Sequence, residues 1–393
     1  MKIESIRLKN FRMFRDVSIN NLPNCCVFVG ANGSGKTSLF DVFRFLRDSL
    51  TYNIKQALAK RGGFQEVVSR GTEGPIELEL QFSNLQTIKA KATYWLIIDL
   101  VENKPVIKRE VLKYQQENGD EQHFFDFSFG KGIVITQEID SDNSLTKLKH
   151  EEKQLESANI LALKGIGQFN QFKIANELRN FIENGHFSDL QISAAKSVNS
   201  VTGYDEHLSS NGNNLALFAR TLFNNYPQQY NEIRRELARR VPGLAKIEPT
   251  TEKGRIFLEF HHDWFKEPFQ AWQVSDGTIQ LFAYMLLLYD PNPYQLLCVE
   301  EPEKHIYSDL LMLLAEEFSE YAGRGEGQVF VSTHSPDFLN GTKLQRIFWL
   351  TQENGYTQVH TTTSEPLLKR LVEAGDLPGA LWKQGLFEGA HPC

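Results

Sequence analysis

The sequence predicts an α/β fold with an antiparallel β-subdomain and a helical insertion. Three patterns support this prediction. Short apolar runs at residues 26–29, 296–299 and 328–333 are typical of buried parallel strands. Alternating apolar and polar residues between 75 and 136 indicate antiparallel strands, and apolar residues at helical spacing indicate helices between about 144 and 245.

The chain begins with residues 2–20, in which polar and apolar side chains alternate as they do in two short strands. We expect these strands to begin one sheet together with the apolar strand at 26–29. A helix is predicted from about Lys36 to Leu50, because apolar residues recur along one of its faces. A polar connection containing glycines follows, up to Gly71.

The alternating region is predicted to form an antiparallel sheet that covers the domain begun by the first strands. Its strand candidates are 76–80, 93–101, 106–114 and 124–135, with a hairpin turn at Glu117-Asn118-Gly119-Asp120.

The helical region from about Ser144 to Ala245 contains helix candidates at 176–182, 215–223 and 228–240. No heptad pattern is sustained here, which argues against a long coiled coil. The last helix carries a basic cluster, made of Arg234, Arg235, Arg239 and Arg240. These arginines either contact phosphates or, as we favour, form a solvated face with pairs four residues apart.

Strands return after Gly254. We expect a strand at 255–262, a helix at 281–289, and strands at 296–299 and 328–333. Between the last two strands lies a helix that Ser308 caps and that runs through Tyr321. The chain then forms a hairpin at 346–360, turning at Asn354-Gly355, and a last helix capped by Ser364. The helix at 281–289 is almost entirely apolar, so it must be buried on nearly all sides.

Composition and charge narrow the class of protein. With 393 residues, of which 41% are hydrophobic, the chain can bury a sizeable core. No apolar run approaches the ~20 residues that a membrane helix needs, and the charged N-terminus is unlike a signal peptide, so we expect a cytoplasmic protein without membrane contact. The net charge of −7 gives no general attraction to nucleic acid, although it leaves room for a local basic patch. The four cysteines show no metal-ligand spacing.

The stretch Gly30-Ala31-Asn32-Gly33-Ser34-Gly35-Lys36-Thr37 fills the pattern G-x-x-x-x-G-K-[ST] between a strand and a helix, which is the context this motif requires. Its glycines let successive N–H groups point at phosphate oxygens, and the helix dipole adds to the attraction. Lys36 is expected to reach the β- and γ-phosphates of ATP, and Thr37 to ligate Mg²⁺. The residues expected to bind nucleotide here are Asn32, Gly33, Ser34, Gly35, Lys36, Thr37 and Ser38.

Two carboxylates, Glu300 and Glu301, follow the apolar strand at 296–299. P-loop enzymes place the carboxylate that serves Mg²⁺ and the residue that activates water at such a position. We assign Glu300 to the metal, through its water shell, and Glu301 to the general base. His334 follows the strand at 328–333 and is expected to contact the γ-phosphate and the attacking water; the alternative is a satisfied core histidine.

Ser275-Asp276-Gly277 stands at the head of the apolar helix. A hydroxyl, unpaired N–H groups and a helix dipole together make a second phosphate-binding end, with Ser275 and Gly277 as binding residues. The alternative is a simple N-cap. Ser332, His334 and Asp337 lie too close together along the chain to indicate a hydrolase triad.

The order of these motifs resembles that of the ABC-type ATPases, and within them the RecF/SMC/OLD branch. The segment Ile6–Phe14 looks like the start of that branch, 274–278 resembles its signature motif, Glu300-Glu301-Pro302-Glu303 its Walker B motif, and 332–336 its switch-histidine segment. The resemblance is strong over residues 1–60 and 255–350. The middle of the chain, with 208–215, looks like stand-alone OLD-like ATPases that accompany bacterial anti-phage defence effectors.

The resemblance implies a P-loop ABC-type nucleotide-binding domain that works as a nucleotide-sandwich dimer, in which Ser275 of one subunit contacts the γ-phosphate held by Lys36 of the other. Glu300 stands where the family usually has Asp. The glutamine of the Q-loop is not assigned, and the candidates are Gln65, Gln81 and Gln168, with Gln168 slightly favoured because it opens the helical region. An OLD-type nuclease domain would follow the ATPase core, and Asp140 and Asp142 are in the wrong place for one.

We expect an ATPase lobe at 1–140, a mainly helical insertion at 141–250 and a second ATPase lobe at 251–393. The favoured hypothesis is an ATP-hydrolysing dimeric switch that controls a separate effector protein in bacterial defence. The second hypothesis is a RecF-like DNA-binding ATPase of repair or maintenance, and the third is a nucleotide-switched scaffold with negligible turnover. The sequence names neither the effector nor its trigger.

Overall fold

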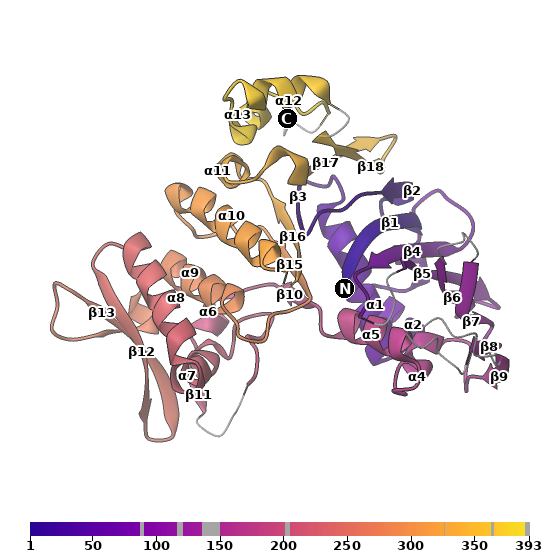
Figure 1. The fold of residues 1–393 in the computed structure, drawn as a ribbon, viewed down its shortest axis with the longest axis horizontal. Coiled ribbons are helices and arrows are strands. Elements are labelled where there is room, and N and C mark those ends of the chain that lie inside the picture. The colour runs from indigo at the N-terminus through magenta and orange to yellow at the C-terminus, as the bar shows by residue number, and fades with distance from the viewer. Residues whose placement is uncertain are drawn as a thin grey trace. The chain divides into compact units, whose positions relative to one another are not determined.

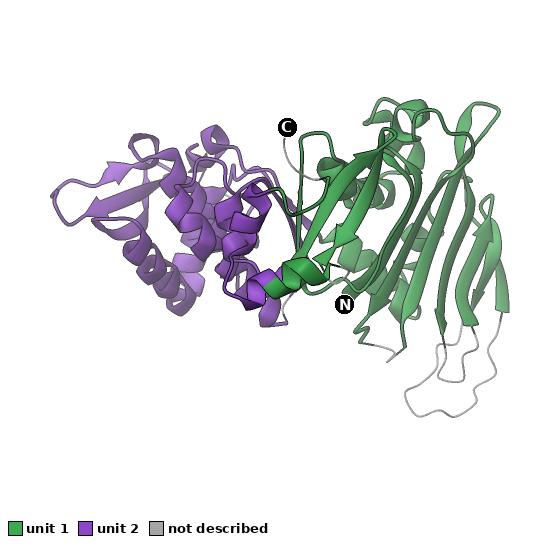
Figure 2. Ribbon diagram, turned by 90° about the horizontal axis from the view of Figure 1, so that it is seen from above, with its two compact units in different colours: residues 1–185, 345–370, 385–393 green, residues 186–344, 371–384 purple. Residues whose placement is uncertain are grey.

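The computed structural model describes residues 1–86, 90–115, 121–135, 150–200, 205–325, 327–362 and 365–389. The chain divides into two compact units, each assembled from segments that are distant in sequence (Figure 2). Unit 1 comprises residues 1–185, 345–370 and 385–393, and unit 2 comprises residues 186–344 and 371–384. Neither unit can therefore be built from one continuous stretch of the chain.

An eight-stranded antiparallel sheet dominates unit 1, with strand order β2-β1-β4-β5-β6-β7-β8-β9 (Figure 1). Along β4, buried residues alternate with half-exposed ones, so one face of the sheet packs on the core and the other faces solvent. The strands are β1 (Lys2–Phe11), β2 (Phe14–Ile19), β4 (Ile76–Ser83), β5 (Ala92–Val101), β6 (Lys104–Gln115), β7 (Glu121–Ser128), β8 (Lys131–Ile135) and β9 (His150–Gln154).

A second group of strands in unit 1 contains the strand that leads into the P-loop. β3 (Cys25–Gly30) pairs in parallel with β17 (Ile347–Glu353), which pairs antiparallel with β18 (Tyr356–Thr361). Our prediction that β1, β2 and β3 begin one sheet was wrong. All six residues of β3 are buried, which fits a core strand, whereas β1 and β2 carry alternating patterns that need one solvent-facing side.

The helices of unit 1 pack around α1, which follows the P-loop. Phe40 of α1 meets Phe28 of β3 with ring centroids 6.2 Å apart, and Phe45 meets Phe11 of β1 at 5.9 Å. α1 therefore joins the two groups of strands through aromatic contacts. The helices are α1 (Lys36–Thr51), α2 (Ile54–Ala59), α3 (Phe64–Val67), α4 (Ala162–Ile166) and α5 (Lys173–Glu183).

Unit 2 contains three parallel strands in the order β10-β15-β16, namely β10 (His186–Ser188), β15 (Leu296–Glu300) and β16 (Gln328–Thr333). The helix α9 (Asp276–Leu288) is buried along nearly its whole length, as its apolar sequence predicts. The remaining helices here are α10 (Ser308–Gly323), α11 (Pro336–Asn340) and α13 (Pro378–Lys383), while α12 (Pro366–Glu373) contains the boundary between the units.

The rest of unit 2 is a small antiparallel sheet with helices on one side. β13 (Arg255–His262) lies between β12 (Leu244–Glu252) on one edge and both β11 (Asn199–Ser200) and β14 (Phe269–Gln270) on the other. The remaining elements are α6 (Ile192–Ala195), α7 (Leu215–Asn225), α8 (Pro227–Arg240) and the 3₁₀ helix η1 (Ala271–Gln273). A second 3₁₀ helix, η2 (Leu344–Arg346), contains a boundary between the units.

Most predicted elements are confirmed within the described residues, including the three helices at 176–182, 215–223 and 228–240 and the C-terminal hairpin. The strand predicted at 124–135 is instead two strands, because Phe129 and Gly130 adopt positive φ angles of 50° and 77° and turn the chain. The region predicted to be helical from about 144 includes strand β9, whose charged, exposed sequence shows neither helical nor alternating periodicity.

Two details of the helix ends also differ or are not tested. Ser308 is the first residue of α10 rather than its cap, since Tyr307 holds the N-cap position. The predicted hairpin turn at 117–120, the cap at Ser364 and the pair Asp140 and Asp142 lie outside the described residues.

Candidate functional site

The P-loop has the backbone that a phosphate cradle requires. Gly33 and Gly35 adopt φ angles of 79° and 105°, a region that residues with a Cβ avoid. Leu39 N–H donates to Gly35 O at 3.0 Å as the α1 ladder begins, so the N–H groups of Thr37 and Ser38 precede it at the helix N-terminus. Asn32, Gly33 and Thr37 are exposed. Backbone donors, a lysine and an exposed threonine hydroxyl on one loop fit a nucleotide triphosphate with its Mg²⁺.

The side chain of Lys36 folds back onto the P-loop and bonds to its carbonyl groups. Its Nζ donates to Gly30 O at 2.8 Å and to Ala31 O at 2.9 Å, and it lies 3.5 Å from the Oγ of Ser34. The residue is only 6% exposed. A phosphate oxygen would give this buried ammonium a negative partner beside the neutral carbonyls that hold it.

The C-terminal hairpin supports the P-loop, which the sequence did not lead us to expect. Gln352 of β17 donates through Nε2 to Gly33 O at 2.7 Å, and the buried Thr357 of β18 donates through Oγ1 to Ser34 O at 2.8 Å. A Cβ at Gly35 would lie 2.3 Å from that Thr357 oxygen. The hairpin itself was predictable, but no local signal shows which loop these two side chains reach.

In unit 2 the end of β15 presents the predicted carboxylates. Glu300 is the last residue of the strand and pairs in register with Ser332 of β16. Glu301 follows with a left-handed φ of 49° and donates its N–H to Ser332 O at 2.8 Å. Such a conformation is unfavourable for a residue with a side chain and is often kept at functional sites.

The Glu301 side chain lies between a lysine and a histidine of unit 2. Its Oε2 is 2.8 Å from Lys304 Nζ, and its Oε1 is 3.7 Å from His334 Nε2. The hydrogen bond that Lys304 donates to Glu301 is the main reason why the pKa of Lys304 is raised. The structure thus brings Glu301 and His334 together, and it adds a lysine that the sequence did not single out.

Glu303 hydrogen-bonds to the backbone of His334. Its Oε1 accepts the backbone N–H of His334 at 2.7 Å, and burial raises the pKa of this carboxyl. Its Oε2 is buried without a hydrogen-bond partner among the described residues. Glu303 therefore fixes the loop after β16, whereas the side chain of His334 is about one-third exposed and stays accessible.

The signature segment stands at the start of α9, also in unit 2. Ser275 is the N-cap residue, with its Oγ 2.8 Å from Thr278 Oγ1 and accepting the Thr278 N–H at 3.3 Å. Its side chain is exposed. Gly277 has no room for a side chain, because a Cβ there would lie 2.4 Å from His305 O. The start of α9 therefore packs closely on the segment that follows Glu301.

The Q-loop candidates are spread over unit 1. Gln65 is exposed on α3, Gln81 is half-exposed on β4, and Gln168 is exposed just after α4. None of these positions distinguishes one glutamine as the nucleotide-sensing residue. The basic cluster of α8 has the pairs four residues apart that we favoured, since Arg240 contacts Glu236 at 2.8 Å and also pairs with Glu317.

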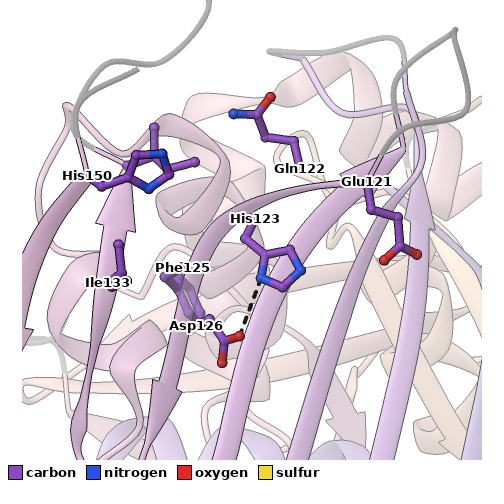
Figure 3. A pocket seen from close by; sticks show the side chains of 8 residues that line it. Glu121, Gln122, His123, Phe125, Asp126, Ile133 and His150 are labelled. Carbon is purple, nitrogen blue, oxygen red and sulfur yellow. Dashed lines mark ion pairs between the residues drawn. The ribbon is translucent and has the colours of Figure 1, made fainter. Parts of the chain in front are cut away.

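A cavity of about 340 Å³ lies elsewhere in unit 1, and it shares no residue with the P-loop (Figure 3). Its lining residues come from β7, β8 and β9. Asp126 lies in it, 3.4 Å from His123 Nδ1 and bonded to the guanidinium of Arg109. The lining residues are Glu121, Gln122, His123, Phe125, Asp126, Ile133, Ile135 and His150. None of these residues belongs to the motifs of the nucleotide site.

Comparison with known proteins agrees with this arrangement of motifs. The family described as "AAA domain, putative AbiEii toxin, Type IV TA system" matches residues 25–340. The DNA replication and repair protein RecF of Lactococcus lactis subsp. cremoris strain SK11 is 34% identical over 101 residues, covering 24% of this chain and 27% of RecF. RecF of L. lactis subsp. lactis strain IL1403 is 25% identical over 230 residues, covering 53% of this chain and 61% of RecF. The chain thus spans about a quarter of the first relative and less than two thirds of the second.

Solved structures show the same fold at low sequence identity. An SMC head bound to the C-winged helix domain of ScpA has a TM-score of 0.55 at 14% identity, covering 94% of this chain and 100% of that one. An SMC head with an extended coiled coil, bound to a domain of ScpA derived from Pyrococcus furiosus, has a TM-score of 0.52 at 14% identity, covering 95% and 99%. With the family match over most of its length, the chain belongs to this AAA-domain family and has the ABC-type ATPase fold of the RecF/SMC branch.

Proposed function

We propose that this protein binds ATP with Mg²⁺ at the P-loop, hydrolyses it, and uses the cycle as a dimeric switch. The observation that carries the proposal is the folded P-loop, with left-handed glycines at 33 and 35 and the buried Lys36 held by loop carbonyls. Lys36 stabilises the β- and γ-phosphates, and the exposed Thr37 hydroxyl ligates the metal.

Glu301 acts as the general base in this proposal, and His334 as a second contact of the attacking water. Glu301 takes the proton of that water as its oxygen attacks the γ-phosphate. The distance of 3.7 Å between Glu301 and His334 supports their acting on one water, because a water between them would bond to both. Glu300 serves the metal through its water shell, with an arm one methylene longer than the family's usual Asp.

The two phosphate-binding ends are assigned to different subunits. Ser275 is exposed at the start of a 13-residue helix, so its hydroxyl and the helix dipole are available to a phosphate brought by a second copy. A two-fold axis then lends each Ser275 to the partner's nucleotide and makes two equivalent sites. ATP holds the dimer closed, and hydrolysis releases it.

The closed dimer acts on another molecule, for which two candidates have separate support. A separate effector protein in bacterial defence is favoured by the family description, which names a toxin of a type IV toxin–antitoxin system. A DNA-bound role in repair or maintenance is favoured by the similarity to RecF. Both candidates rest on the same ATP-driven closure in the cytoplasm.

Mixed mutants test the shared-site dimer. Lys36→Ala and Ser275→Arg should each be inactive alone, because each homodimer carries one lesion in both of its sites. In a mixed dimer one site has both lesions and the other has none, so part of the activity should return. If both sites must hydrolyse ATP together, the mixed dimer would show no recovery of activity. Crosslinking of Glu301→Gln therefore provides a second readout. ATP should produce dimers in Glu301→Gln that Ser275→Arg removes, and an oligomeric state indifferent to ATP in both would refute the dimer.

A further inference from the structure

Lys196 forms hydrogen bonds with the residues before and after the exposed Ser275. It follows helix α6 of unit 2, and its Nζ donates to Val274 O at 2.8 Å and to Asp276 Oδ1 at 2.6 Å. Only 19% of the Lys196 side chain is exposed. A long side chain loses conformational freedom in such a double contact, so the contact defines the geometry of the segment that it joins.

Asp276 needs a cation at this position. It is the first residue of α9, and 49% of its side chain is exposed. The hydrogen bond from Lys196 is the main cause that lowers the pKa of this carboxyl, so it is ionised at neutral pH. A carboxylate there suits the helix dipole, but it also repels any phosphate that approaches the neighbouring Ser275.

The orientation of Ser275 also depends on its two neighbours. The side chain of Ser275 caps α9 through Thr278, and its carbonyl accepts the Ile279 N–H at 3.2 Å as the helix begins. The Val274 carbonyl is the backbone acceptor that precedes it. Lys196 donates hydrogen bonds to the Val274 carbonyl and to the Asp276 carboxylate at the same time. One ammonium therefore fixes the residue before Ser275 and the residue after it.

We propose that Lys196 is a positioning residue of the second phosphate-binding end: it orients the Ser275 segment and cancels the charge of Asp276, so that a triphosphate can approach. This inference rests on the proposed function, because Ser275 meets phosphate only in the closed dimer. It makes Lys196 act on nucleotide-driven association and leaves nucleotide capture by the P-loop unaffected.

The experiment compares Lys196→Met, Lys196→Arg and the double variant Lys196→Met with Asp276→Asn, all in full-length protein carrying Glu301→Gln. ATP-dependent dimerisation, measured by sedimentation at a series of ATP concentrations, should need about tenfold more ATP in Lys196→Met than in the parent. Lys196→Arg should stay within about twofold of the parent. The double variant should recover most of the loss, because it removes the uncompensated carboxylate.

Two controls separate a structural defect from the proposed role. Lys266→Met removes an exposed lysine of the same unit and should change nothing. Binding of a fluorescent ATP analogue to the monomer at low protein concentration should be equal in all variants. If Lys196→Met does not fold, Lys196→Gln replaces it, since the amide keeps a hydrogen-bond donor without the charge.

The outcomes distinguish the inference from the function on which it rests. Unchanged dimerisation in Lys196→Met, or a defect that Asp276→Asn leaves intact, would overturn the role of Lys196 while the dimer itself stands. Absence of ATP-dependent dimers in the parent as well would instead overturn the proposed function, and the inference with it.

Discussion

Glu301 combines two features of a residue kept for chemistry: a left-handed backbone at the end of a buried strand, and a carboxylate between Lys304 and His334. The sequence pattern of an apolar strand followed by two acids was enough to predict its location. It was not enough to predict Lys304, because an exposed lysine three residues further on looks like any solvated side chain.

Glu301→Gln keeps the size and the hydrogen bonds of this side chain but removes its basicity. Turnover of ATP should fall by roughly 10²-fold or more, in line with the loss of a general base, while ATP binding persists. Steady-state hydrolysis and calorimetric titration of the same preparation measure the two effects. Unchanged turnover would place the base elsewhere, and Glu303→Gln, which should mainly loosen the loop at His334, would then be tested next.

A second residue-scale prediction concerns Glu110, which is completely buried in unit 1. Its carboxylate accepts the N–H groups of Ala162 at 2.5 Å and Leu163 at 2.9 Å, where α4 starts, and the hydroxyl of Tyr94 at 3.0 Å. The hydrogen bonds favour the ionised form, but burial outweighs them and raises the pKa of Glu110 from 4.5 to about 7. The folded protein therefore holds a proton on Glu110 that the unfolded chain releases between these two pH values.

The sign of the pH dependence follows from that proton. Because the folded state binds more protons between pH 4.5 and about 7, the Glu110 contribution to the free energy of unfolding falls as the pH rises through this window. Its total is on the order of 3 kcal/mol. Urea unfolding at several pH values should show a flatter profile in Glu110→Gln, whereas Glu121→Gln, an exposed carboxylate of the same sheet, should keep the parent's slope. Identical slopes in all three proteins would contradict the prediction.

At the scale of elements, the P-loop and its helix were predictable because the signal is local: the glycine pattern, the apolar strand before it and the helical spacing after it. The partnership of β3 with β17 was not predictable, since it joins residues more than 300 positions apart. The wrong assignment of β1 and β2 to the sheet of β3 has the same origin. The periodicity of apolar residues shows which face of a strand is buried, but it does not show which other strand pairs with it.

The contact between the P-loop and the hairpin gives an element-scale prediction. Gly35→Ala places a Cβ 2.3 Å from Thr357 Oγ1 at a φ of 105°, so the loop must move or the hairpin must withdraw. The affinity for ATP should fall by at least about tenfold. Gly325→Ala is the matched control, because Gly325 has a φ of 78° but no atom within 4 Å of the added Cβ. Calorimetry on both variants decides, and equal affinities would mean that the hairpin does not constrain the loop.

For the whole molecule, charge separates the two candidate functions. The net charge is −7, and Arg239 and Arg240 of the basic cluster are paired with carboxylates. We therefore expect weak binding to double-stranded DNA with a shallow dependence on salt, even in Glu301→Gln with ATP. Affinities measured between ~50 and ~200 mM salt test this, because each phosphate contact adds about 0.9 to the slope of log K against log salt. A steep slope would favour the RecF-like role over control of an effector protein.

No helix among the described residues is long and apolar enough to cross a membrane. The similarity to SMC heads covers nearly the whole chain, yet at 14% identity it carries the fold and not the task. The motifs predict the chemistry that we propose, while the assignment of each motif to one of two discontinuous units came from the structure.

Because each unit is made of segments distant in sequence, strands that pair in the folded protein are synthesised at very different times. β3 and the P-loop emerge among the first forty residues, but β17, which pairs with β3, and β18, which pairs with β17, are synthesised after residue 346. At a synthesis rate of ~5–20 residues per second, β3 is made tens of seconds before its partner β17. During that interval an apolar strand is exposed to other nascent chains, and a chain that stops before residue 347 lacks the partner strand β17.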